Sequence, residues 1–140
     1  MTQVTFHVNA PDPTAYTCRL LRKAASLGAK VMVTGAPDAL DRLDLALWTF
    51  APLEFVPHCR SAAPASVLQA SPIVLSGPQE KVPGASVLLH LGGPAPENPG
   101  QFEKIIEVVG QGVPDIQEVR QRWKLYAGQG CDMVHHEVTQ

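Results

Sequence analysis

Residues 3–34 read QVTFHVNAPDPTAYTCRLLRKAASLGAKVMVT, and this stretch decides the fold. Apolar and polar side chains alternate over residues 3–8, which predicts a β-strand. Asp12 is suited to cap a helix over residues 13–27, and a proline is favourable at the first helical position. The apolar run over residues 30–34 is typical of a strand that is buried on both faces. A strand, a helix and a strand within about thirty residues make a βαβ unit, in which the two strands run parallel.

Both of the first two predicted helices carry an apolar stripe. In the helix over residues 13–27, side chains at spacings of three and four predict one buried face, which comprises Tyr16, Leu20, Leu21, Ala24 and Leu27. A glycine follows at position 28, and helices commonly end at such a residue. The second helix is predicted over residues 37–50. Its apolar residues are Leu40, Leu43 and Leu47, with Trp48 and Phe50 as further candidates.

The remaining elements continue this order of strands and helices. They are an apolar hairpin-like segment over residues 53–60, a loop over 61–70, strands over 72–75 and 86–91, a loop over 92–100, a helical turn that leads into a strand over 102–109, and a helix over 113–126. This order predicts the α/β class, with an open, mostly parallel twisted sheet and helices on both faces. The predicted topology is therefore Rossmann-like.

The length and the composition are those of one globular domain. The chain has 140 residues, of which 45% are hydrophobic and 17% are charged, and this predicts a single domain over residues 1–140. Residues 129–140 show no clear period and are expected to form a partly ordered C-terminal tail. No signal peptide or membrane span is recognisable, and three widely spaced cysteines suit a reducing compartment. The sequence therefore predicts a cytoplasmic protein without a membrane partner.

Nucleotide binding and catalysis lack their usual residues. The turn at residues 9–13 has no glycine, two prolines and an aspartate where a phosphate would lie, and the turn at 34–38 is equally poor. The chain has no P-loop motif. His58 and Cys59 are neighbours that point to opposite faces of an extended segment, so they do not form a nucleophile–base pair. We therefore expect no catalytic residue, no cofactor and no metal site.

The helix over residues 113–126, VPDIQEVRQRWKLY, carries the pattern that points to function. Four apolar or aromatic residues are spaced by three and four and fall on one face: Ile116, Val119, Trp123 and Tyr126. Arg120 and Lys124 are four residues apart and lie beside each other on a neighbouring face, whereas Arg122 points elsewhere. An apolar edge beside two cations suits a ligand that carries both a hydrophobic group and a carboxylate.

Four segments resemble the chi subunit of the bacterial DNA polymerase III holoenzyme, over nearly the full length of the chain. They are VTFHV (residues 4–8), RLDLALW (42–48), FVPH (55–58) and VPDIQEVRQRWKLY (113–126). LDLALW followed after six residues by FVPH is fairly specific, because a tryptophan and these apolar residues seldom occur at this fixed spacing by chance. The first helix and the central strands match the family in pattern only.

The resemblance implies a non-enzymatic adaptor of DNA replication. Chi subunits sit on the clamp loader through the small psi subunit, and they bind the acidic, hydrophobic C-terminal tail of single-stranded DNA-binding protein. Arg120, Trp123 and Lys124 match the family positions that hold this tail, with Val113 at the entrance. Trp48 and Phe55 match family positions on the side of the subunit that faces psi. Another partner, such as a repair helicase, is an alternative for this side. The resemblance therefore implies that the chain is connected to nucleic acid only through its protein partners.

Each of these residues also has a purely structural interpretation. Arg120 and Lys124 are compatible with an ordinary solvated helix face, and Trp123 is compatible with a place in the core. Trp48 and Phe55 are equally compatible with the core and with an exposed apolar patch. If the tail binds, its upstream aspartates are expected to meet the remaining basic residues, among them Arg122.

Two other classes of function compete with the adaptor. The βαβ start alone motivates a small nucleotide-binding protein or an enzyme on a Rossmann-like fold. Direct binding of DNA is disfavoured by the net charge of -2 and by the lack of a basic stripe with interleaved aromatic residues.

Overall fold

The structure is a computed structural model, and it describes residues 2–49, 56–77, 82–111 and 116–138. Within these residues the strands are β1 (Gln3–Ala10), β2 (Val31–Thr34), β3 (His58–Arg60), β4 (Ile73–Ser76), β5 (Val87–His90), β6 (Lys104–Gly110) and β7 (Asp132–Glu137). The helices are α1 (Pro13–Ser26), α2 (Pro37–Thr49), α3 (Ala65–Ala70) and α4 (Ile116–Gly128), together with a 3-10 turn, η1 (Pro99–Gln101).

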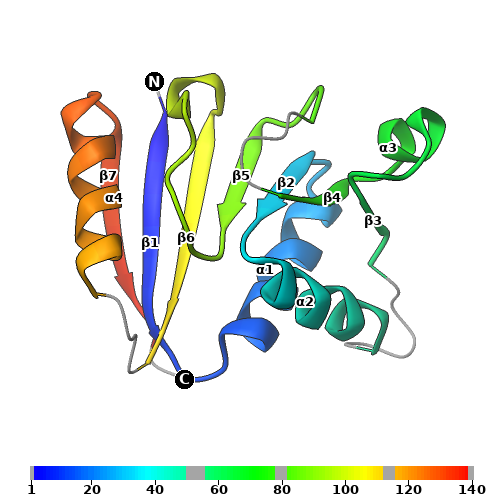
Figure 1. The fold of residues 1–140 in the computed structure, drawn as a ribbon, viewed down its shortest axis with the longest axis horizontal. Coiled ribbons are helices and arrows are strands. Elements are labelled where there is room, and N and C mark those ends of the chain that lie inside the picture. The colour runs from blue at the N-terminus through cyan, green and yellow to red at the C-terminus, as the bar shows by residue number, and fades with distance from the viewer. Residues whose placement is uncertain (1, 50–55, 78–81, 112–115, 139–140) are drawn as a thin grey trace.

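The strands form one sheet in the order β3-β4-β2-β5-β6-β1-β7, and each neighbouring pair is parallel. This confirms the predicted α/β class with an open parallel sheet. The strands β1 and β2 run in the same direction, as the βαβ unit predicts, but β6 and β5 lie between them. Figure 1 shows α4 with β1 and β7 at one end of the sheet, and α2 and α3 toward the other end.

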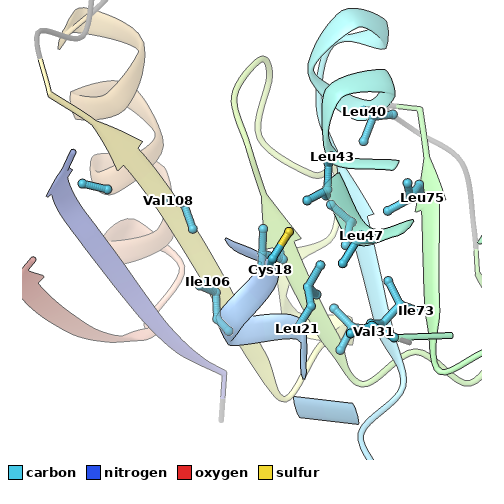
Figure 2. Close-up of a cluster of buried hydrophobic side chains, with 14 of the residues drawn as sticks. Cys18, Leu21, Val31, Leu40, Leu43, Leu47, Ile73, Leu75, Ile106 and Val108 are labelled. Carbon is cyan, nitrogen blue, oxygen red and sulfur yellow. The ribbon is translucent and has the colours of Figure 1, made fainter. Parts of the chain in front are cut away.

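Helices cover both faces of the sheet, as predicted. On one face, α1 and α2 pack on the strands through a cluster whose members include Cys18, Leu21, Leu40, Leu43 and Leu47. Figure 2 shows the three α2 leucines close to Ile73 and Leu75, which extend from β4. On the other face, Tyr126 of α4 packs with Phe6 and Ile105. The two clusters follow from the alternation of side chains along each strand.

The helix α1 begins as the sequence predicts. The Asp12 carboxylate accepts a hydrogen bond from the Ala15 backbone N–H at 3.1 Å, and Pro13 is the first helical residue. Gly28 has a φ of 81°, a conformation that ends a helix without strain. The prediction that Leu27 is buried was wrong: the helix ends at Ser26, Leu27 is its C-cap residue, and its side chain is 76% exposed.

The region after α2 differs from the prediction in two ways. Residues 58–60 form the edge strand β3, which pairs with β4 in parallel, so the segment is not a hairpin there; residues 53–55 of the predicted segment lie outside the described residues. The predicted loop over 61–70 contains the helix α3. This helix has no buried residue, so it has no apolar stripe that a sequence pattern would reveal.

The expected C-terminal tail contains the strand β7. It pairs in parallel with β1 over six residue pairs, and the Val138 N–H beyond it donates to the carbonyl of Val8 at 2.9 Å. The side chains of β7 are exposed or half-buried throughout, because β7 lies at the edge of the sheet. An edge strand of this kind shows no alternation of apolar and polar residues, so its sequence carries no strand signal.

His7 of β1 makes the stability of the protein depend on pH. Its Nδ1 lies within hydrogen-bond distance of the Tyr16 hydroxyl oxygen, at 2.6 Å. Burial of the ring, with repulsion from His136 and Lys104, lowers the pKa of His7 from 6.5 to about 4. In the unfolded chain His7 therefore binds a proton below about pH 6.5, whereas in the folded chain it does so only below about pH 4. The contribution of His7 to the free energy of unfolding is therefore fully present above about pH 6.5, and it is lost as the pH falls toward 4.

We expect the wild-type protein to lose about 1 to 3 kcal/mol more unfolding free energy between pH 7 and pH 4.5 than the His7→Gln variant. The upper value is what the full pKa shift gives, and it is reduced because the ring is only half-buried. Urea unfolding of both proteins at the two pH values measures the difference. Equal losses in the two proteins would show that His7 does not cause the acid sensitivity.

Candidate functional site

The helix α4 carries most of the residues that the sequence singles out. Its described part begins at Ile116, and the predicted start with Val113 lies outside the described residues. Tyr126 is fully buried against the sheet, and Val119 and Trp123 are half-buried beside it. Ile116 is 50% exposed. The predicted apolar face is therefore buried at the Tyr126 end of the helix and half-exposed at the Ile116 end.

One side of α4 combines apolar surface with positive charge. We call it the α4 flank, and it consists of Ile116, Arg120, Trp123 and Lys124. The Trp123 ring packs on Phe6 of β1, with ring centroids 5.1 Å apart and planes inclined by 57°. Trp123 thus takes part in the core while its remaining surface faces solvent, so its structural and functional interpretations are both compatible with the geometry.

The two cations of the α4 flank are exposed. Among the described residues, neither Arg120 nor Lys124 has a hydrogen-bond or ion-pair partner. Their spacing of four residues places both charges on the same side of the helix. The flank therefore offers a guanidinium, an ammonium and half-exposed apolar surface within two helical turns, which is the arrangement that an acidic peptide with a hydrophobic residue would need.

Arg122 does not belong to this flank, and the expectation that it meets the aspartates of a tail was wrong. It is 6% exposed, and its Nε donates to both carboxylate oxygens of Glu107, at 3.0 and 3.1 Å. Its Nη1 donates to the carbonyl of Gly93 at 3.0 Å. This guanidinium is buried and paired with Glu107, so it does not face solvent on the α4 flank.

Tyr126 and His90 complete a buried polar cluster around Glu107. The Tyr126 hydroxyl donates to Glu107 Oε2 at 2.7 Å, and burial together with the Glu107 charge raises the pKa of Tyr126. The hydroxyl therefore remains a donor at physiological pH. His90 Nδ1 lies 3.3 Å from Glu107 Oε1, and His90 Nε2–H donates to the carbonyl of Pro94 at 2.8 Å.

This cluster was not predicted from the sequence, although one residue indicated it. Glu107 stands in the middle of the apolar run IIEVV, which forms a strand buried on both faces. A carboxylate at such a position needs a cationic or hydrogen-bonding partner. Arg122 was the partner, and it lies one turn before Tyr126 on the inward side of α4.

Of the second set of predicted residues, Trp48 lies on α2, on the other side of the sheet from α4. Trp48 is 61% exposed, which excludes a place in the core, and Leu45 is 68% exposed. The Trp48 ring stands edge-on to His58, with centroids 5.4 Å apart. His58 in turn contacts the Asp44 carboxylate through Nε2, at 2.8 Å. Phe55 lies outside the described residues.

A cavity of about 450 Å³ opens where β5 and β6 end, between the starts of α1 and α2 and the side of α4 that carries Glu118. Open α/β sheets bind ligands at this edge. Here, however, the Asp12 carboxylate already accepts from the N-terminal turn of α1 and places a negative charge where a phosphate would lie. The cavity therefore does not favour the nucleotide alternative.

None of the described helices has both the length and the hydrophobicity that a membrane span needs.

Comparison with known proteins identifies the family. The family model described as "DNA polymerase III chi subunit, HolC" matches residues 1–134. DNA polymerase III subunit chi from Pseudomonas aeruginosa is 29% identical over 143 aligned positions, which cover 99% of this chain and 98% of the relative. Both findings confirm the resemblance carried by the four sequence segments. The chain therefore belongs to the family of DNA polymerase III chi subunits, which are accessory subunits of the replication machinery.

Proposed function

We propose that this chain is a non-catalytic adaptor that links the polymerase III clamp loader, through psi or an equivalent partner, to the C-terminal tail of single-stranded DNA-binding protein. The observation that carries the proposal is the α4 flank. Arg120 and Lys124 are exposed there without partners among the described residues, and they lie beside the half-exposed surface of Trp123. This is the site that the family resemblance implies for the tail.

The flank matches the chemistry of an acidic peptide that ends in a hydrophobic residue. The planar guanidinium of Arg120 suits the terminal carboxylate, with which it forms two parallel hydrogen bonds, and the Lys124 ammonium adds a mobile second charge. Trp123 and Ile116 provide apolar surface for the last side chain. Val113, for which the resemblance implies a place at the entrance of the site, precedes the described part of α4 by three residues and lies outside the described residues.

Binding of this kind is weak for one tail and strong for many. A short peptide held by two cations and one apolar slot binds at about micromolar strength, or roughly -8 kcal/mol. Single strands coated with the binding protein display many tails, so the effective concentration of tails near the clamp loader is high. The adaptor therefore keeps the loader near its template without contacting the DNA itself.

The surface around Trp48 is the proposed site for the loader-side partner. Trp48 and Leu45 expose adjoining apolar surface on α2, and the Trp48 ring packs edge-on against His58. His58 is fixed by hydrogen bonds to the Asp44 carboxylate and to the Val56 carbonyl. An exposed tryptophan held in this way is suited to be an anchor in a protein interface.

Single substitutions at the two sites are expected to separate the two functions. Arg120→Ala should weaken binding of a tail peptide about 10-fold or more, because a hydrogen bond to a charged group contributes about 1.5 to 3 kcal/mol. Trp48→Ala should leave tail binding within about 2-fold and reduce capture of psi or its equivalent from purified clamp-loader components. Calorimetric titration measures the first interaction, and co-purification measures the second.

Neither substitution should change the melting temperature by more than a few degrees, because both side chains are exposed. A variant Arg120→Ala with unchanged peptide affinity would remove the tail from the α4 flank. Loss of both interactions in one variant would indicate a general defect of the fold instead of two separate sites.

A further inference from the structure

The cluster of Glu107, Arg122 and Tyr126 has no part in the proposed binding site, although it is the most polar region of the core. Glu107 and Tyr126 are fully buried, and Arg122 is 6% exposed. Three hydrogen bonds converge on one carboxylate: the Nε of Arg122 donates to both of its oxygens, and the Tyr126 hydroxyl donates to Oε2. The charges therefore cancel within the protein, and the cluster adds no field that would attract a ligand.

This cluster joins α4 to two other parts of the fold. Glu107 belongs to the central strand β6, and both Arg122 and Tyr126 belong to α4. The Nη1 of Arg122 also donates to the carbonyl of Gly93, in the loop that follows β5. One guanidinium thus ties the helix to the sheet and to the loop at the same time.

Part of the contact between α4 and the sheet is apolar, and it comes from Tyr126, Trp123 and Val119. Of its described side chains, only Arg122 and Tyr126 are buried, and Leu125 on the far side is 40% exposed. Apolar contact has no preferred direction, whereas hydrogen bonds require defined distances and angles. The hydrogen bonds of Arg122 therefore restrict the rotation of α4 about its own axis.

The rotation of α4 decides whether the α4 flank faces solvent. Successive residues of a helix are rotated by about 100°. Because Arg122 points into the core, Arg120 and Lys124, two positions before and after it, point away from the sheet. A rotation of the helix by one residue would carry one of these cations toward the core and would remove the pair from the surface.

We infer that Arg122 is a positioning residue, which Glu107 and Tyr126 hold so that α4 presents Arg120, Trp123 and Lys124 to the tail. The inference rests on the proposed function of the flank. Buried ion pairs contribute little net stability compared with well-packed apolar residues, and the best-supported use of such polar groups is to select one packing arrangement. We infer that use here, where the arrangement selected is a helix rotation.

The test replaces the polar cluster by apolar residues of similar size. The triple variant Glu107→Met, Arg122→Met and Tyr126→Phe leaves no charge or hydroxyl of these three residues unpaired, so it is expected to fold and to melt cooperatively. Amide hydrogen exchange of α4 should then become at least 10-fold faster, while exchange in β1, β5 and β6 stays as in the wild type. The affinity for the tail peptide should fall at least 5-fold, although Arg120, Trp123 and Lys124 are unchanged.

A folded triple variant with wild-type exchange in α4, or with an affinity within 2-fold of the wild type, would overturn the inference. If the triple variant does not fold, Tyr126→Phe alone decides, because it removes only the hydroxyl: we expect exchange in α4 to be about 3-fold faster, and unchanged exchange would contradict the inference. The wild-type protein is titrated in parallel. A wild-type protein that does not bind the peptide would refute the proposed function, and the exchange result would still decide whether the cluster holds α4.

Discussion

Replacing Glu107 by glutamine is expected to lower the free energy of unfolding by about 3 to 5 kcal/mol, since it leaves the Arg122 charge buried without a counter-ion. The side chain keeps its size, so no cavity contributes to the change. Glu107 is fully buried and accepts from both Arg122 and Tyr126, and a neutral amide satisfies these donors poorly. Urea unfolding at neutral pH, followed by circular dichroism, measures the loss.

Glu103→Gln is the matched control for this substitution. Glu103 precedes β6 by one residue and is exposed, so the same chemical change is expected to alter stability by less than about 0.5 kcal/mol. Equal effects of the two substitutions would contradict the assignment of a buried ion pair. The contrast with the apolar triple variant is informative as well, because breaking one half of the pair destabilises the fold while replacing the whole cluster does not.

Reversing the charge of the α4 flank should abolish binding of the tail peptide. The double variant Arg120→Glu and Lys124→Glu replaces two attractive contacts with two that repel an acidic peptide. Each lost charged hydrogen bond accounts for about 1.5 to 3 kcal/mol, so micromolar binding becomes undetectable. Both side chains are exposed and have no partner among the described residues, so the melting temperature should change little.

The control is the double variant Arg19→Glu and Lys23→Glu. These two cations are also exposed and four residues apart, but they lie on α1, on the opposite face of the sheet from α4. Both double variants change the net charge of the protein by the same amount. If the α1 variant lost binding as completely as the α4 variant, attraction would come from the overall charge and no local site would be needed.

The sequence was sufficient to predict the elements that have strong local signals. The strand over residues 3–8, the capped helix that begins at Pro13 and the buried strand after Gly28 all lie where they were predicted. Each owes its position to short-range chemistry: alternation, a helix cap and an apolar run. The parallel sheet and the helices on both faces followed from their order.

Elements without such signals were missed. The edge strand β3 has three half-buried residues, and β7 is almost wholly exposed, so neither shows a period. The position of β1 between β6 and β7 depends on pairing between segments that are distant in the sequence. No pattern within one segment determines such pairing.

The candidate site was predictable only in part, for the same reason. The spacing of Arg120, Trp123 and Lys124 indicated a charged and apolar helix side, and the structure places these residues together on α4. The inward direction of Arg122 depends on Glu107, fifteen residues earlier and on a different element. The family resemblance named the ligand, and no physical property of the flank alone distinguishes one acidic peptide from another.

The most direct test of the adaptor is a titration of the wild-type chain with a peptide of the last residues of single-stranded DNA-binding protein, at low and at high salt. Calorimetry gives the affinity, and the summed fluorescence of Trp123 and Trp48 reports a change in the environment of a tryptophan. We predict saturable binding at about micromolar strength that weakens as salt increases, because charges contribute to it. Absence of saturable binding at both salt concentrations would contradict the proposed role of the α4 flank.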